Sequence, residues 1–289
     1  MKRAKIITVI NMKGGVAKTL TTQMIGYGLA RNGYRVLLVD SDPQGNLTSL
    51  ILPEIDFTGL ELKDGRLTVE ALRTAKKNYE MIVNGNEKVT DNKTLSDLLQ
   101  KSASVEDCIY HTCYEGLDII PSDLGLSTLI YDLQSNAANG MPQLRLKKEL
   151  KYLPYDVIVI DNSPSLNIMT VNSVYASRVV LIPTTMDQTS ISGMLLTLIQ
   201  CNKMIDELDH DRDYKFMILG TMMNRTKYDR DASEALREVF GSIYFSTVIR
   251  YQSAPIRRAR ISDKLLLDDK KSAVAAEYNA FISELMEKL

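Results

Sequence analysis

A glycine-containing loop between a predicted strand and a predicted helix constrains this chain more than any other segment. The loop is residues 11–19, Asn-Met-Lys-Gly-Gly-Val-Ala-Lys-Thr, and it directly follows the apolar run 6–10. A helical pattern begins at Lys18. Backbone N–H groups of such a loop and of a helix N-terminus converge on anions, and the helix dipole adds a favourable field. The segment therefore predicts a binding site for a phosphate chain in a protein built from strands and helices.

The spacing of this loop departs from the ordinary phosphate-loop pattern G-x-x-x-x-G-K-[ST], because Met12 and Ala17 occupy the two glycine positions. It fits the deviant form K-G-G-x-x-K-[ST], whose signature is an additional lysine, here Lys13. Lys18 is predicted to reach the β- and γ-phosphates of a nucleotide, and the Thr19 hydroxyl to ligate Mg²⁺. A plain strand-to-helix turn with solvated lysines is the alternative, but it needs no Gly-Gly, Lys and Lys-Thr together.

Carboxylates end two further strand-like segments. The runs 35–40 and 156–161 are apolar up to Asp40 and Asp161, as in strands buried in a parallel sheet, and Asp42 follows two residues after Asp40. Doubly wound sheets place their ligands at the carboxyl ends of their strands. Beside bound phosphates, carboxylates there hold Mg²⁺ directly or through its waters. Helix capping is the alternative for any one of these residues, and it explains all three less well.

The three segments resemble the Walker A, A′ and B motifs of ParA/Soj-type partition ATPases, in the ParA/MinD superfamily. The resemblance rests on residues 13–19, 39–46 and 159–165. It continues through 115–122, 180–184 and the pair Asn224-Arg225, and so spans nearly the whole chain. It implies the small type of partition ATPase, without an N-terminal helix-turn-helix domain.

The resemblance also implies an ATP site. Its residues would be Gly14, Gly15, Val16, Ala17, Lys18, Thr19 and Leu20 of the loop, with Asn224 on the adenine and Arg225 nearby.

Catalytic and metal roles follow from the same resemblance. Lys13 would cross the interface of an ATP-sandwiched homodimer and offset the repulsion between the two triphosphates. Lys18 would hold the phosphates and Asp42 would orient the attacking water. In the implied Mg²⁺ site, Thr19 is the ligand, Asp40 holds a metal-bound water, and Asp161 completes the outer shell.

Two departures from the family pattern bear on activity. Ala17 replaces the usual glycine before Lys18, which would cost about 1 kcal/mol if that position needs a positive φ. We expect ATP binding to survive and hydrolysis to be slow. Leu20 stands where the family often has threonine, and 245–247 lacks a proline often found beside the adenine.

A basic cluster between residues 250 and 264 predicts sequence-independent DNA binding, with a steep salt dependence. The implied DNA-binding residues are Arg250, Arg257, Arg258 and Arg260. A solvated loop and helix face is the alternative. An ATP-driven dimer would present two such clusters and so bind DNA more tightly.

Composition bounds the remaining possibilities. A net charge of −1 over 289 residues excludes a globally basic nucleic-acid binder, and the three cysteines have no metal-ligand or redox spacing.

We predict one domain over 1–289, with a polar insertion near 52–93 on the nucleotide face. The C-terminal helix carries three glutamates and one lysine from residue 273 onward, which argues against binding to an anionic membrane.

Alternating strand and helix patterns predict an α/β fold: a doubly wound, mainly parallel sheet of seven to eight strands with helices on both faces. Strands are predicted near 5–11, 35–40, 117–121, 156–161, 178–183, 215–223 and 243–249. Helices are predicted near 18–32, 94–102, 123–135, 142–151, 167–176, 190–208, 231–240 and 272–288.

The resemblance therefore implies a cytoplasmic DNA partition ATPase. Mg²⁺ and ATP would drive dimerisation and binding to double-stranded DNA on the nucleoid, and a centromere-binding, ParB-like partner would stimulate slow hydrolysis. Two alternatives stay open: a positioning ATPase for a non-DNA cargo, and a metabolic ATP-dependent ligase of the same P-loop group.

Overall fold

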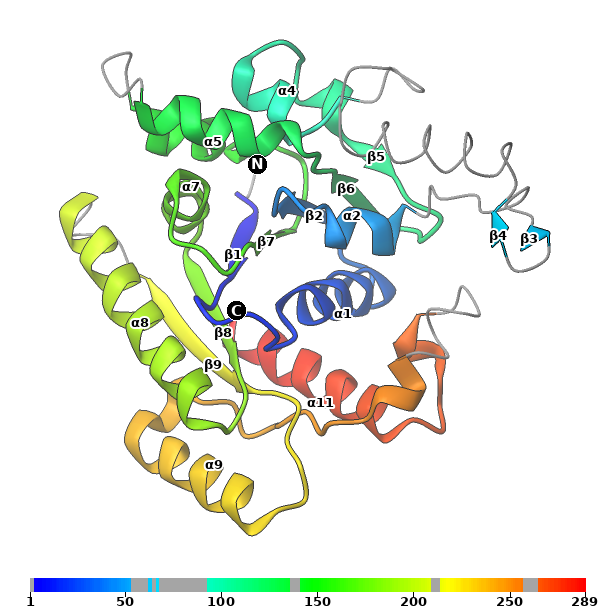
Figure 1. Cartoon of the computed structure of the whole chain (residues 1–289), viewed down its shortest axis with the longest axis vertical. Helices are drawn as coiled ribbons and strands as arrows, with labels where there is room; N and C mark the ends of the chain where they lie inside the picture. Colours follow the sequence, from blue (N-terminus) through cyan, green and yellow to red (C-terminus); the bar gives the residue numbers. More distant parts are fainter. Residues whose placement is uncertain are drawn as a thin grey trace.

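A seven-stranded sheet forms the centre of the protein (Figure 1). The computed structural model describes residues 3–52, 62–63, 66–67, 93–135, 141–208, 214–256 and 265–289. The strand order is β5-β6-β2-β7-β1-β8-β9, and only β5 runs antiparallel to its neighbour. The strands are β1 (Lys5–Val9), β2 (Val36–Ser41), β5 (Tyr110–His111), β6 (Leu117–Ile120), β7 (Val157–Asn162), β8 (Val179–Thr184) and β9 (Lys215–Gly220). A separate short hairpin pairs β3 (Leu62–Lys63) with β4 (Arg66–Leu67).

Helices cover both faces of this sheet (Figure 1). One face packs against α1 (Lys18–Arg31), α2 (Asn46–Ile51) and α11 (Ala273–Lys288). The other packs against α4 (Leu95–Gln100), α5 (Gly125–Ser135), α6 (Arg145–Leu150), α7 (Ile168–Ala176) and α8 (Gln188–Leu208). α9 (Lys227–Phe240) lies beyond β9, and short 3₁₀ turns lie at Glu106–Cys108, Pro142–Leu144, Gly241–Ile243 and Leu266–Asp268. Among the described residues, no helix combines the length and apolarity needed to cross a bilayer.

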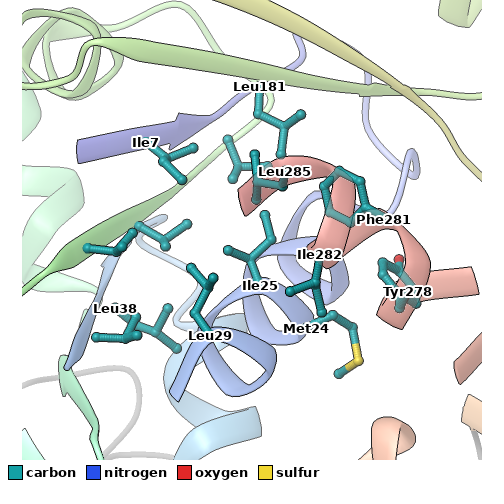
Figure 2. Packing of buried hydrophobic residues seen from close by; sticks show 14 of the residues in the cluster. Ile7, Met24, Ile25, Leu29, Leu38, Leu181, Tyr278, Phe281, Ile282 and Leu285 are labelled. Carbon is teal, nitrogen blue, oxygen red and sulfur yellow. The ribbon is translucent and has the colours of Figure 1, made fainter. Parts of the chain in front are cut away.

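The alternation of side chains along the strands explains why both faces are covered. In β2, Val36 and Leu38 point to the α1 face, while Leu37 and Val39 point to the α5 face, and all four are fully buried. Such strands cannot face water on either side, so helices must flank the sheet on both sides. Figure 2 shows the α1 face, where Ile25 of α1 lies among side chains of the sheet and of α11.

The strand register sets the positions of the two carboxylates predicted at strand ends. β7 lies between β1 and β2, and its Asp161 pairs with Val9 on one side and with Asp40 on the other. The loop after β1 therefore begins beside both acidic residues. This edge of the sheet is where a doubly wound fold offers a ligand site.

The predicted fold class is confirmed, as are six of the seven predicted strands and the approximate positions of the eight predicted helices. The prediction of a strand over 243–249 is wrong. That segment begins in a 3₁₀ turn and forms no strand; among the described residues, its one bridge to the sheet is the isolated pair of Tyr244 with Ile218 of β9. Its buried residues Tyr244, Phe245 and Ile249 do not alternate as strand residues do. Most of the insertion predicted at 52–93 lies outside the described residues.

The contact between α1 and α11 gives a test of this packing. A methyl group on Gly28 of α1 would overlap the Cδ1 atom of Ile282 of α11, which is itself buried. We expect Gly28→Ala to lower the free energy of unfolding by about 1–3 kcal/mol because the core is overpacked. Urea unfolding measures the loss. Ile282→Val removes the Cδ1 methyl, so it should partly rescue Gly28→Ala; two fully additive losses would contradict the predicted overlap.

Candidate functional site

The loop after β1 presents one lysine to solvent and buries another. Lys13 is exposed together with Gly14 and Gly15, and a Cβ added at either glycine would meet nothing within 4 Å. Lys18 has an exposed fraction of 8%, and its Nζ donates to the Lys13 carbonyl oxygen at 2.9 Å. Burial lowers the pKa of Lys18, while the charges of Asp161 and Asp42 oppose that shift. The lysine is thus held under an open loop, where an anion can reach it.

Side chains from other strands and helices hold the loop in place. The Asn11 side chain donates to the Pro183 carbonyl at the end of β8 and accepts from the Lys13 N–H, both at 2.8 Å. On α8, Thr197 accepts from the N–H of Met12 at 3.0 Å. Thr221, fully buried after β9, donates to the Val16 carbonyl at 3.1 Å.

Ala17 adopts a left-handed backbone, with φ of 62° and ψ of 29°, directly before α1. Gly15 is also left-handed, with φ of 78°. An L-residue in this region costs about 1–2 kcal/mol, so the loop carries strain at Ala17 that a glycine would avoid. The positive φ on which the predicted penalty depended is therefore present.

Asp161 is a buried carboxylate with an unsatisfied oxygen. Its Oδ1 accepts from the Thr22 hydroxyl at 3.1 Å, while Oδ2 is buried with no hydrogen-bond partner. The Thr19 side chain is near enough to oppose part of the rise in the pKa of this carboxyl. Burial, and then the nearby charge of Asp40, raises the pKa of Asp161 to about 8. An orphaned oxygen beside the Thr19 hydroxyl is a donor set that fits Mg²⁺ or its waters, and a dication would favour the ionised carboxylate.

Asp40 is more fully engaged by the protein. Its Oδ2 accepts from the N–H and hydroxyl of Thr48, each at 2.8 Å, and its Oδ1 accepts from the Asp42 N–H at 3.1 Å. Burial raises its pKa to about 6 in spite of these bonds. Asp40 therefore shapes the turn that carries Asp42, and only its Oδ1 retains capacity for a further donor such as a metal-bound water.

A cavity of about 640 Å³ opens over the loop. Its lining includes the polar side chains Lys18, Thr19 and Asp42 and the apolar side chains Leu20, Met222, Ile249, Ile256, Val274 and Tyr278. A lining that combines polar groups of a phosphate loop with apolar side chains suits a nucleotide, which has a phosphate chain and a base.

The predicted adenine residues lie elsewhere. Asn224 lines a neighbouring cavity of about 640 Å³, together with Lys13 and Asp187, and its backbone N–H and side-chain amide both donate to Asp229. Arg225 is exposed and lines neither cavity. Neither residue lines the first cavity, and their contact with adenine stays a prediction.

Among the four predicted DNA-binding arginines, only Arg250 is described; Arg257, Arg258 and Arg260 lie outside the described residues. Arg250 lines the first cavity, and its Nε is 2.5 Å from Glu277 Oε1.

Sequence reasoning missed several residues of the site. Thr22 follows Thr19 by three residues and so lies on the same face of α1, a helical spacing that could have revealed it. Thr221, Glu277 and Tyr278 act through contacts between distant segments and left no local signal.

Comparison with known proteins assigns the family. The family model described as "AAA domain" matches residues 4–213. The sporulation initiation inhibitor protein Soj of Bacillus subtilis is 30% identical over 282 residues, which cover 95% of each chain. The chain belongs to the ParA/MinD-type ATPases.

Other relatives of this ParA/MinD-type ATPase span most of its length. The chromosome partitioning protein ParA of Caulobacter vibrioides is 27% identical and covers 98% of the chain and 94% of its own length. The cell division protein PomZ of Myxococcus xanthus is 26% identical, and the match covers 97% of this chain and 77% of PomZ.

Three solved structures share the fold of this ParA/MinD-type ATPase. A plasmid partition protein from Borrelia burgdorferi bound to AMPPNP has a TM-score of 0.72 at 22% identity and covers all of both chains. The ATP complex of a McdA variant from Cyanothece has a TM-score of 0.74 at 21% identity, and the match covers 99% of this chain and 98% of the McdA chain. The third structure is cobyrinic acid a,c-diamide synthase of Mycobacterium smegmatis with a bound ATP analog and magnesium. It has a TM-score of 0.70 at 24% identity, and the match covers 98% of this chain and 95% of the synthase chain.

The strain at Ala17 is open to a direct test. Ala17→Gly should raise the free energy of unfolding by about 0.5–1 kcal/mol, since relief of left-handed strain exceeds the added entropy of the unfolded chain. It should also tighten nucleotide binding, because a methyl group leaves the phosphate loop. Thermal unfolding and titration with a fluorescent ATP analogue measure the two effects.

Lys101 supplies the matched control, since it is also left-handed, with φ of 64°, at the end of α4. Lys101→Gly should stabilise the protein similarly and leave nucleotide affinity unchanged. Equal gains in affinity from both variants would show that the effect of residue 17 is not local.

Proposed function

We propose that this protein is a Mg²⁺- and ATP-dependent partition ATPase that works as a nucleotide switch. ATP occupies the cavity over the loop, with its phosphates on Lys18 and on the backbone of 14–19. Thr19 would ligate Mg²⁺, Asp40 would hold one of its bound waters, and Asp161 would complete its outer shell. Asp42, at the wall of the same cavity, orients the water that attacks the γ-phosphate.

The observation that carries this proposal is the arrangement of charge at the carboxyl edge of the sheet. A buried lysine and an exposed lysine flank an open Gly-Gly turn, and a buried carboxylate with an unsatisfied oxygen lies beside the threonine hydroxyl. This set is incomplete without a phosphate anion and a cation, which Mg²⁺ and ATP supply together. The nucleotide complexes among the structural relatives support the same ligand.

ATP-bound protomers form a homodimer in which each Lys13 reaches the partner's phosphates. The dimer binds double-stranded DNA without base readout, and a centromere-binding, ParB-like protein accelerates its slow hydrolysis. The partition proteins among its relatives support this cargo. A DNA titration with ATP, with ADP and without nucleotide, at two salt concentrations, tests the scheme: affinity should be highest with ATP and fall steeply with salt.

Lys13→Gln separates dimerisation from ATP binding. The Lys13 side chain is exposed, and Lys18 uses only the Lys13 backbone carbonyl, so ATP affinity should change less than about threefold. ATP-dependent dimers should disappear in light scattering. Lys203→Gln removes another exposed lysine, on α8, and should dimerise normally. An unchanged dimer in Lys13→Gln would remove the crossing role of Lys13.

Asp42→Ala isolates the hydrolytic step. The variant should bind ATP and remain a DNA-bound dimer, because the attacking water loses its orienting carboxylate; turnover should fall by about 10²-fold or more. Phosphate release and DNA retention measure the two properties. Normal turnover in this variant would exclude Asp42 from catalysis.

The neighbouring cavity favours one second candidate, a metabolic ligase. It lies against Lys13 and Gly14 and is lined by polar groups, among them Thr185, Ser190 and Asp229. A small carboxylic acid there would sit beside the phosphate loop. Stimulation of ATP turnover by such acids, with no response to DNA, would favour the ligase over the partition ATPase.

A further inference from the structure

Two glutamates of α11 hold the segment that follows the turn at 241–243. Glu284 accepts from the N–H and hydroxyl of Ser246, at 2.9 and 2.8 Å, and from the N–H of Thr247 at 3.0 Å. Glu277 accepts from Arg250 twice: Oε2 from its backbone N–H at 2.8 Å, and Oε1 from Nε at 2.5 Å. Both carboxylates thus bind the same short segment, at its two ends.

The spacing of the two carboxylates matches the segment they hold. Glu277 and Glu284 are seven residues apart, which is about 10.5 Å along a helix. The three residue-to-residue steps from Thr247 to Arg250 span about 10 Å when extended. The helix therefore fixes where the backbone of residue 250 lies, and with it the wall of the nucleotide cavity that Arg250 and Tyr251 form.

The helix that carries Glu277 is itself fixed. Tyr278, the next residue, is fully buried, and its hydroxyl lies 3.2 Å from that of Thr21, three residues after Lys18. Further along, Ile282 packs on Gly28 of α1. Glu277 therefore cannot follow Arg250 if the arginine moves. The Arg250 side chain, 36% exposed, can rotate away while the carboxylate keeps its bond to the backbone N–H.

In this structure, Arg250 does not present a free positive charge. A carboxylate in contact with Nε neutralises the guanidinium, and any phosphate that approaches also meets the like charge of Glu277. An arginine contributes to sequence-independent DNA binding because its positive charge replaces the counterions around a phosphate. An arginine that is already paired with a glutamate releases fewer counterions and so binds the phosphate more weakly.

We propose that Glu277 is an intramolecular competitor of DNA phosphate for Arg250. The pair holds nucleotide-free protein off DNA, and Arg250 binds the DNA backbone only after its guanidinium leaves Glu277. The proposal rests on the DNA binding proposed above and adds to it the residue that restrains it.

Glu277→Gln tests the proposal, because the amide oxygen can keep the backbone contact while the charge on the guanidinium is released. DNA affinity of the nucleotide-free protein should rise about fivefold, in line with the loss of one partly exposed ion pair. Fluorescence anisotropy on a duplex of arbitrary sequence at two salt concentrations measures it, and the salt slope should steepen.

Glu284→Gln is the matched control. It adds the same unit of charge on the same helix and loosens the same segment, but it does not touch Arg250. It should raise DNA affinity much less than Glu277→Gln. A double-mutant cycle completes the design: in an Arg250→Ala background, Glu277→Gln should no longer strengthen DNA binding. Thermal unfolding confirms that each variant is folded.

Several outcomes overturn the proposal. Equal gains from both glutamine variants would reduce the effect to overall charge, and a persistent gain in the Arg250→Ala background would exclude Arg250 as the released group. Weaker DNA binding by Glu277→Gln would make Glu277 a support for Arg250 instead of a competitor. A gain in ATP affinity without a gain in DNA affinity would assign the freed arginine to the nucleotide.

The wild-type protein separates failure of this inference from failure of the proposed function. If the ATP-bound wild type does not bind DNA, both fail. If the wild type binds DNA but Glu277→Gln binds it no more tightly, only this inference is overturned.

Discussion

The structure depends on an imbalance of charge at the carboxyl edge of the sheet. The strand register places Asp40 and Asp161 side by side, both fully buried, with Lys18 as the nearby cation. Burial raises the pKa of both carboxyls, because two neighbouring carboxylates are costly to keep charged away from water. A phosphate chain would engage Lys18, and a dication would satisfy Asp161. Binding free energy can thus come from completing a site that folding leaves unfinished.

Holding such a site open requires rigid surroundings, and the two layers of helices provide them. α1 begins at the loop and packs along its length between the sheet and α11, with Gly28 giving Ile282 close access (Figure 2). The last helix of the chain therefore contacts the helix that begins at the phosphate loop. Tyr278 and Glu277 of the same helix contact Thr21 of α1 and Arg250, and both Tyr278 and Arg250 line the cavity over the loop. One packed pair of helices therefore positions part of the lining of this cavity.

Local patterns in the sequence predicted most of the fold and the phosphate end of the site. The apolar runs ending in Asp40 and Asp161 indicated the buried strands, and the two lysines around Gly-Gly indicated the loop, because these signals depend on near neighbours. The strand predicted at 243–249 was wrong, since buried residues there pack at the sheet edge without a continuous ladder. The pairing of Arg250 with Glu277 and the support of Val16 by Thr221 join segments far apart in the chain, and no local period reveals them. Asn224 could be matched to a family motif, but its partner Asp229 depends on the turn before α9.

Backbone strain concentrates where the phosphate loop meets the segment after β9. Apart from glycines, the described residues include three with positive φ, and two of these are Ala17 and Met222. The residues just before them, Val16 and Thr221, are joined by the hydrogen bond from the Thr221 hydroxyl to the Val16 carbonyl. Strained residues persist where the surrounding structure over-determines them, and they concentrate at functional sites. Met222 lines both cavities, and Met223 pairs with Arg250 at the sheet edge. A shift of the phosphate loop that relaxed Ala17 would therefore act on the Thr221 contact first. Met223, two residues after Thr221, pairs with Arg250, so the shift would next reach the backbone of Arg250. The phosphate loop and Arg250 are therefore linked by a short chain of contacts, although 233 positions separate Ala17 from Arg250 in the sequence.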